Sequence, residues 1–121
     1  MIAGTEYSPS KAFIEFARNF FESLAVDDFQ GALGQLDKSE KSWSKSSISG
    51  DLKKVLNGRW VCSAKSFRKS ASPELEVGLN EYMLRHRIPC EGKWSDAKVN
   101  FCFRQKEGTG YYYVYLIGFE H

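Results

Sequence analysis

The last 28 residues of the chain, Trp94–His121, read WSDAKVNFCFRQKEGTGYYYVYLIGFEH and decide the fold. Two runs in this stretch alternate apolar and polar residues, and they flank Glu107-Gly108-Thr109-Gly110. Alternating runs around a short glycine-containing segment are typical of a β-hairpin. A two-residue loop, Gly108–Thr109, and a four-residue loop, Glu107–Gly110, both predict the same register.

That register gives the hairpin two different sides. On the first side Val99 faces Gly118, Phe101 faces Leu116 and Phe103 faces Val114, so this side is apolar and is expected on the core. The second side pairs Lys98 with Phe119, Asn100 with Ile117, Cys102 with Tyr115, Arg104 with Tyr113 and Lys106 with Tyr111. The second side is aromatic and cationic, which makes it the candidate functional face.

The first half of the chain predicts three helices. Apolar residues recur at three- and four-residue steps between Ser8-Pro9 and Leu24, and again over residues 29–36 and 48–56. A polar loop, residues 37–47, separates the second helix from the third and holds Trp43 as an anchor. The expected N-caps are Ser8, Asp27 and Ser47 or Ser49, and the third helix should stop at Asn57-Gly58.

The second half predicts strands. Residues 59–67 and 76–88 both read as strands, and turn-prone residues 68–73 separate them. Pro89 is expected to end the second strand, with Cys90–Ser95 connecting to the hairpin. Helices followed by an antiparallel sheet argue for an α+β fold in one domain, residues 1–121.

Composition indicates an ordinary globular protein, with 42% hydrophobic and 26% charged residues. The net charge of +2 is too small to indicate nucleic-acid binding by itself. The three cysteines share no metal-ligand spacing and are expected to be reduced thiols. The N-terminus lacks a basic stretch followed by an apolar run, and no stretch approaches the roughly 20 apolar residues of a membrane span. A soluble cytoplasmic protein is therefore expected.

The sequence shows no catalytic or cofactor signature. His86 lies between Arg85 and Arg87, which should disfavour its protonated form, so it is interpreted as a sheet histidine rather than a general base. Asp96 could be a base in a pocket, but capping its own turn explains it better. There is no metal-ligand cluster and no glycine-rich phosphate loop. We therefore expect no enzyme activity, no metal and no cofactor.

The candidate binding surface draws on more than one strand. If the strand ending at Ile88 pairs beside residues 97–104, its arginines join the second side of the hairpin. Tyrosine and arginine are enriched at interface hot spots. The alternative is a solvated sheet face whose cationic stems cover the tyrosine rings. The residues predicted to contact a partner are Arg85, Arg87, Trp94, Asp96, Arg104, Lys106, Tyr113 and Tyr115.

A resemblance appears along the same stretch. Ile88-Pro89, the Trp94-Ser95-Asp96 step, an alternating strand, a glycine turn and a final aromatic-aliphatic strand resemble the C-terminal half of small bacterial immunity proteins. The leading helices followed by a curved sheet also resemble the NTF2/cystatin-like folds that several immunity families use. The resemblance implies a cytoplasmic protein that binds a cognate toxin domain, for example a nuclease, and covers its active or substrate-binding surface. It carries over no catalytic residue.

Two other functions stay open. Small-ligand binding or catalysis of the NTF2-like type needs a pocket between the first helix and the sheet. Complete filling of that space by Phe13, Phe16 and Phe20 would exclude such a pocket. Single-stranded nucleic acid could stack its bases on exposed tyrosines, although the small net charge argues against it. Weak self-association is the remaining alternative.

Overall fold

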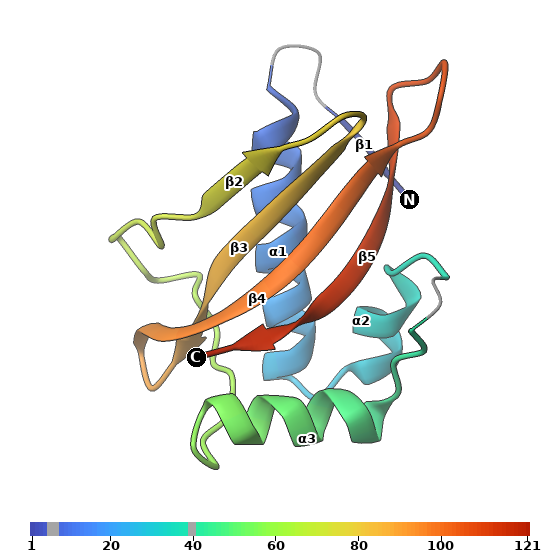
Figure 1. Ribbon diagram of the computed structural model, residues 1–121. Helices are drawn as coiled ribbons and strands as arrows, with labels where there is room; N and C mark the ends of the chain where they lie inside the picture. Colours follow the sequence, from blue (N-terminus) through green and yellow to red (C-terminus); the bar gives the residue numbers. More distant parts are fainter. Residues whose placement is uncertain (5–7, 39–40) are drawn as a thin grey trace.

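The computed structural model describes residues 1–4, 8–38 and 41–121. It shows an α+β fold, as expected, with three helices and one five-stranded antiparallel sheet of order β1-β5-β4-β3-β2. The helices are α1 (Pro9–Ala25), α2 (Phe29–Gly34) and α3 (Lys45–Val55), and the strands are β1 (Ile2–Ala3), β2 (Glu74–Val77), β3 (Glu81–Cys90), β4 (Lys93–Gln105) and β5 (Tyr111–Glu120). Figure 1 shows the sheet curving around α1, with α3 lying across one end.

The helix boundaries follow the sequence signals with small corrections. Helix α1 begins at Pro9 after Ser8, as predicted. Asp28 caps α2 instead of Asp27, because its carboxylate accepts the Gly31 N–H at 2.9 Å. Ser44 caps α3 instead of a later serine, and it forms a capping box with Ser47. The expected polar loop lies between α2 and α3, and residues 39–40 of it lie outside the described residues.

The predicted strand over residues 59–67 is wrong. Only Val61 forms a bridge, opposite Cys90. The Cys62 N–H also donates to the Pro89 carbonyl at 3.0 Å. On either side of this contact the segment bonds to α1: the Trp60 indole N–H donates to the Leu24 carbonyl at 3.0 Å, and Glu22 accepts the Ala64 N–H at 2.9 Å. Hydrogen bonds to the C-terminal end of α1 therefore replace most of the strand pairing that the residue types favoured.

The predicted strand over residues 76–88 is two strands joined by a turn. The Gly78 N–H donates to the Glu81 carbonyl at 2.8 Å and Asn80 has a φ of 61°, so the chain reverses between β2 and β3. Pro89 lies inside β3 instead of ending it, at a register shift against β4. Proline is tolerated at such irregular positions. The connection to β4 is a tight turn at Glu91-Gly92, where both residues have positive φ.

The β4–β5 hairpin keeps the predicted register over its first half. Phe101 faces Leu116 and Phe103 faces Val114, and the bond from the Lys106 N–H to the Tyr111 carbonyl at 2.9 Å closes the four-residue version of the loop. Past Phe101 the register shifts by one residue, because Ile117 is an extra residue in β5. The pairs predicted beyond this bulge are wrong: Val99 faces Phe119, Asn100 faces Gly118 and Lys98 faces Glu120.

The core fills the space between α1 and the concave face of the sheet. The Phe13 ring stacks on Phe103 with centres 4.1 Å apart, and Phe16 and Phe20 meet Phe101 edge-on at 5.3 and 5.2 Å. The predicted core side of the hairpin is confirmed as buried: Val99, Phe101, Phe103, Val114 and Leu116. Phe119 also turns inward, against Trp43, as the bulge requires.

Candidate binding surface

The outer face of the sheet, away from α1, carries an aromatic and cationic cluster on β4 and β5. Arg104 faces Tyr113 across the strands, and its guanidinium lies 5.6 Å from the centre of the Tyr115 ring. The Tyr113 and Tyr115 rings stack with their centres 6.4 Å apart. We call Arg104, Tyr113 and Tyr115 the tyrosine cluster. The sequence analysis placed these three residues together on this face, and the structure confirms that placement.

A groove of about 600 Å³ runs beside the tyrosine cluster. Its lining combines β4 and β5 with the segment between α2 and α3: Lys38, Lys41, Cys102, Arg104, Tyr115, Leu116 and Ile117. The two lysines were missed by the sequence analysis, which read their segment only as a loop. No spacing pattern points to them, because their position depends on how this segment is tied to β5.

Two side chains tie that segment to the free edge of β5. The Asp37 carboxylate accepts the Val114 N–H at 2.8 Å and also pairs with the Met1 ammonium at 2.8 Å, while the Asp37 N–H donates to the Val114 carbonyl. The Trp43 indole N–H donates to the Leu116 carbonyl at 2.8 Å. The predicted role of Trp43 as an anchor is therefore confirmed.

The other predicted cations lie on the same face but form ion pairs within the sheet. Arg85 pairs with Glu120, where its Nε donates at 2.7 Å, and with Glu74 at 3.4 Å. Arg87 pairs with Asp96 at 3.0 Å. Arg104 itself lies 3.4 Å from Glu81. The predicted cations thus lie on this face, and acidic residues of β2, β3, β4 and β5 balance its arginines.

Asp96, Trp94 and Lys106 lie apart from the tyrosine cluster. Asp96 has an 82% exposed side chain and is one of the residues that line an open cleft of about 240 Å³. The Trp94 ring turns toward α1 and contacts Phe67 and His86 at 5.0 and 5.3 Å, while its N–H donates to the Lys69 carbonyl. Lys106 lies at the exposed end of the hairpin loop. The structure thus brings together three of the eight predicted contact residues as one cluster.

The titratable groups of this region are not arranged as a nucleophile with a base. Burial raises the pKa of the Cys102 thiol, and the nearby Glu81 carboxylate raises it further, so the protonated thiol is favoured. His86 is fully buried on the other face, among core side chains. Burial lowers the pKa of His86, and the charge of Arg18 lowers it further. The hydrogen bond with the Arg87 carbonyl acts in the opposite direction and raises the pKa. Burial is thus the main cause of the lowered pKa of His86, and not the flanking Arg85 and Arg87, as the sequence suggested.

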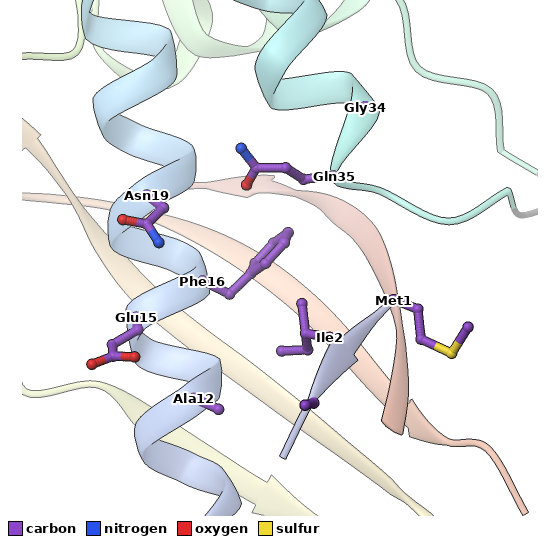
Figure 2. A pocket seen from close by; sticks show the side chains of 9 residues that line it. Met1, Ile2, Ala12, Glu15, Phe16, Asn19, Gly34 and Gln35 are labelled. Carbon is purple, nitrogen blue, oxygen red and sulfur yellow. The ribbon is translucent and has the colours of Figure 1, made fainter. Parts of the chain in front are cut away.

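A second cleft, of about 360 Å³, lies between β1, α1 and the end of α2. Figure 2 shows the Phe16 ring pointing from α1 toward the space between Ile2 and Gln35. Glu15 is the one carboxylate side chain among the described residues that line it. Within the described part of the chain, no group of three or more His, Cys, Asp or Glu residues could hold a metal ion. None of the helices in that part is both long and apolar enough to cross a membrane.

Comparison with known proteins gave no match: no family model, curated protein or solved structure is similar to this chain. The binding surface is therefore interpreted from its own geometry.

Proposed function

We propose that this protein is a non-catalytic inhibitor that binds a cognate toxin domain and covers its active or substrate-binding surface, as small bacterial immunity proteins do. The tyrosine cluster beside its groove carries this proposal. Tyrosine and arginine give an interface large contact area together with polar groups. A long helix wrapped by a curved sheet is the arrangement that the NTF2/cystatin-like resemblance implies, and we include that fold assignment in the proposal.

The groove indicates which part of a toxin would be bound. Arg104 and Lys38 flank Tyr115 with their charged ends exposed, and they suit carboxylates of the partner. Arg85 pairs with Glu74 and Glu120 and Arg87 pairs with Asp96, whereas Arg104, 3.4 Å from Glu81, keeps a 57% exposed side chain beside the groove, so we place the acidic contact at the tyrosine cluster. We infer that the cluster engages acidic groups on the surface of the toxin domain that it covers.

The two alternative functions have less support. A pocket of the NTF2-like type would lie between α1 and the sheet, where the described residues Phe13, Phe16 and Phe20 pack directly on Phe101 and Phe103. Single-stranded nucleic acid would use the tyrosine rings, but the ion pairs of the outer face leave little net positive charge for phosphates. Salt-sensitive binding of an oligonucleotide by the purified protein would favour this second alternative.

Growth rescue tests the proposal. The toxin domain encoded by the gene next upstream is expressed in cells together with the wild-type chain, Arg104→Ala or Tyr115→Ala. Wild type should restore growth, and Arg104→Ala should weaken binding to the purified toxin domain by ~2 kcal/mol if the site is a hot spot. Lys65→Ala, at an exposed position away from the sheet face, is the matched control and should bind normally. Failure of the wild type to bind and rescue would sink the proposal.

A further inference from the structure

The two edges of the sheet are protected differently. Along β5, β1 pairs with Tyr111 and Tyr112, Asp37 holds both backbone groups of Val114, and Trp43 donates to the Leu116 carbonyl. Along β2, none of the described residues forms a hydrogen bond with the backbone groups that point away from β3. Figure 1 shows β2 as the outermost strand on its side of the sheet. An unprotected edge is a template for an added strand.

The pairing with β3 fixes which backbone groups are free. The bond from the Gly78 N–H to the Glu81 carbonyl makes this pair a hydrogen-bonded position of the ladder. Hydrogen-bonded pairs alternate along an antiparallel ladder, so the N–H and C=O groups of Leu75 and Val77 point away from β3. Pro73, the next position of the same kind, has no N–H. The edge therefore offers both an N–H and a C=O group only at Leu75 and Val77.

The side chains along this edge have two distinct sides. Val77 lies on the inner side and is 71% exposed, and Leu79, in the turn that follows, is 92% exposed. On the outer side Glu74 and Glu76 project. Glu74 already lies 3.4 Å from both Arg85 and Lys98, whereas Glu76 forms no ion pair with any residue that the structure describes. Apolar side chains beside unpaired backbone groups are what a strand-accepting edge requires, since the added strand covers both.

We propose that the β2 edge binds an extended segment of a partner protein as an added antiparallel strand, in which apolar residues alternate with lysine or arginine. The main-chain groups of Leu75 and Val77 bind its backbone. Its apolar residues cover Val77 and Leu79, and its cations lie beside Glu74 and Glu76, where opposite charges on neighbouring strands stabilise pairing. This site does not use the tyrosine cluster, so it goes beyond toxin inhibition and stands or falls separately from it.

Charge argues against a second copy of this chain as the occupant. Antiparallel pairing of Leu75 with Leu75 of the copy sets Glu74 opposite Glu76, and pairing of Leu75 with Val77 sets Glu76 opposite itself. Pairing of Val77 with itself leaves the glutamates at diagonal positions. Like charges opposite each other destabilise a strand pair, and a cationic partner strand replaces this repulsion by attraction.

Peptide binding followed by amide NMR shifts tests the site. The probe is a capped peptide of alternating lysine and valine, and the controls are a peptide of the same composition with all lysines before the valines and an alternating glutamate–valine peptide. The lysine–valine peptide should shift and protect the amides of Leu75 and Val77. Glu76→Lys and Val77→Pro should each weaken its binding about tenfold, by reversing a charge and by removing a donor that β3 does not use. Glu107→Lys, at the exposed loop between β4 and β5, is the matched control and should bind as wild type does.

Three results would overturn the proposal. Equal binding of the block peptide would show that only net charge matters. Shifts confined to the tyrosine cluster would place the peptide elsewhere. Shifts at Leu75 and Val77 that grow with protein concentration in the absence of peptide would make a second copy the occupant. Glu76→Lys changes only an exposed side chain, so it keeps the test decisive even if Val77→Pro does not fold.

Discussion

Phe101 and Arg104 lie on opposite faces of β4 and should respond in opposite ways to truncation. Phe101 is fully buried against Phe16 and Phe20, so Phe101→Ala should lower the free energy of unfolding by ~3–5 kcal/mol, the usual range for emptying a core phenylalanine site. Arg104 has a 57% exposed side chain, so Arg104→Ala should change the free energy of unfolding by no more than about 0.5 kcal/mol. Urea denaturation of both variants measures the contrast.

The outcome for Arg104 also separates stability from binding. A stable Arg104→Ala variant that no longer binds its partner assigns the residue to the interface. A variant that unfolds easily would instead mean that its contacts with Tyr115 and Glu81 hold the sheet together. That result would contradict the interpretation of the tyrosine cluster as a binding surface.

At the scale of elements, the segment between α2 and α3 should depend on Asp37 for its attachment to β5. Asp37→Asn keeps an oxygen for the Val114 N–H and loses the charge that pairs with the Met1 ammonium, so it should cost at most about 1 kcal/mol. Asp37→Ala leaves the N–H of a buried residue without its acceptor and should cost ~1–3 kcal/mol. Denaturation of both variants, with hydrogen exchange at Val114, measures the difference. Equal losses in the two variants would show that the hydrogen bond contributes nothing.

Elements whose signals are local were predictable from the sequence. The β4–β5 hairpin follows from alternation and a glycine turn, and the α1 stripe follows from spacing, so both the core side and the tyrosine cluster could be placed. The register failed past Phe101, because the run Leu116-Ile117-Gly118-Phe119 does not show which residue is extra. Packing of Phe119 against Trp43, a contact distant in sequence, selects the bulge at Ile117.

Elements that depend on distant partners were missed. Residues 59–67 have strand-forming side chains, but Trp60 and Ala64 bond to α1 instead. The turn at Gly78–Asn80 was missed because apolar and polar residues alternate on both sides of it. Lys38 and Lys41 reach the candidate site only because Asp37 and Trp43 bond to β5, and no pattern in the segment encodes that bonding.

At the scale of the whole molecule, strand pairing in the sheet determines which charged residues lie beside each other. Basic residues on two neighbouring strands suggested a cationic face, yet the register places an acidic residue within ion-pair distance of Arg85, Arg87 and Arg104. The net charge of the chain is only +2. Any specific partner must be recognised by local shape and pairing at the tyrosine cluster or the β2 edge, because the overall field is weak.

His86, the one buried histidine, should make the free energy of unfolding depend on pH. His86 is fully buried on the inner side of β3, where Phe21, Trp94 and Arg18 pack around it. Its Nδ1 lies 2.7 Å from the Arg87 carbonyl oxygen, which fixes Nδ1 as the protonated nitrogen, and its Nε2 has no hydrogen-bond partner among the described residues. Protonation of Nε2 would bury a charge near the Arg18 guanidinium.

The free energy of unfolding should therefore fall as the pH drops below about 6.5, the ordinary pKa of histidine. Burial lowers the pKa of His86 in the folded protein, so below that pH the unfolded chain takes up a proton that the folded chain still refuses. The loss is at most about 1.4 kcal/mol for each pH unit, and it levels off below the folded pKa. Urea denaturation between pH 5 and 8 should show this slope in the wild type and in His121→Gln, and a flatter profile in His86→Leu, which cannot titrate. Parallel profiles for the wild type and His86→Leu would assign the pH dependence to other groups.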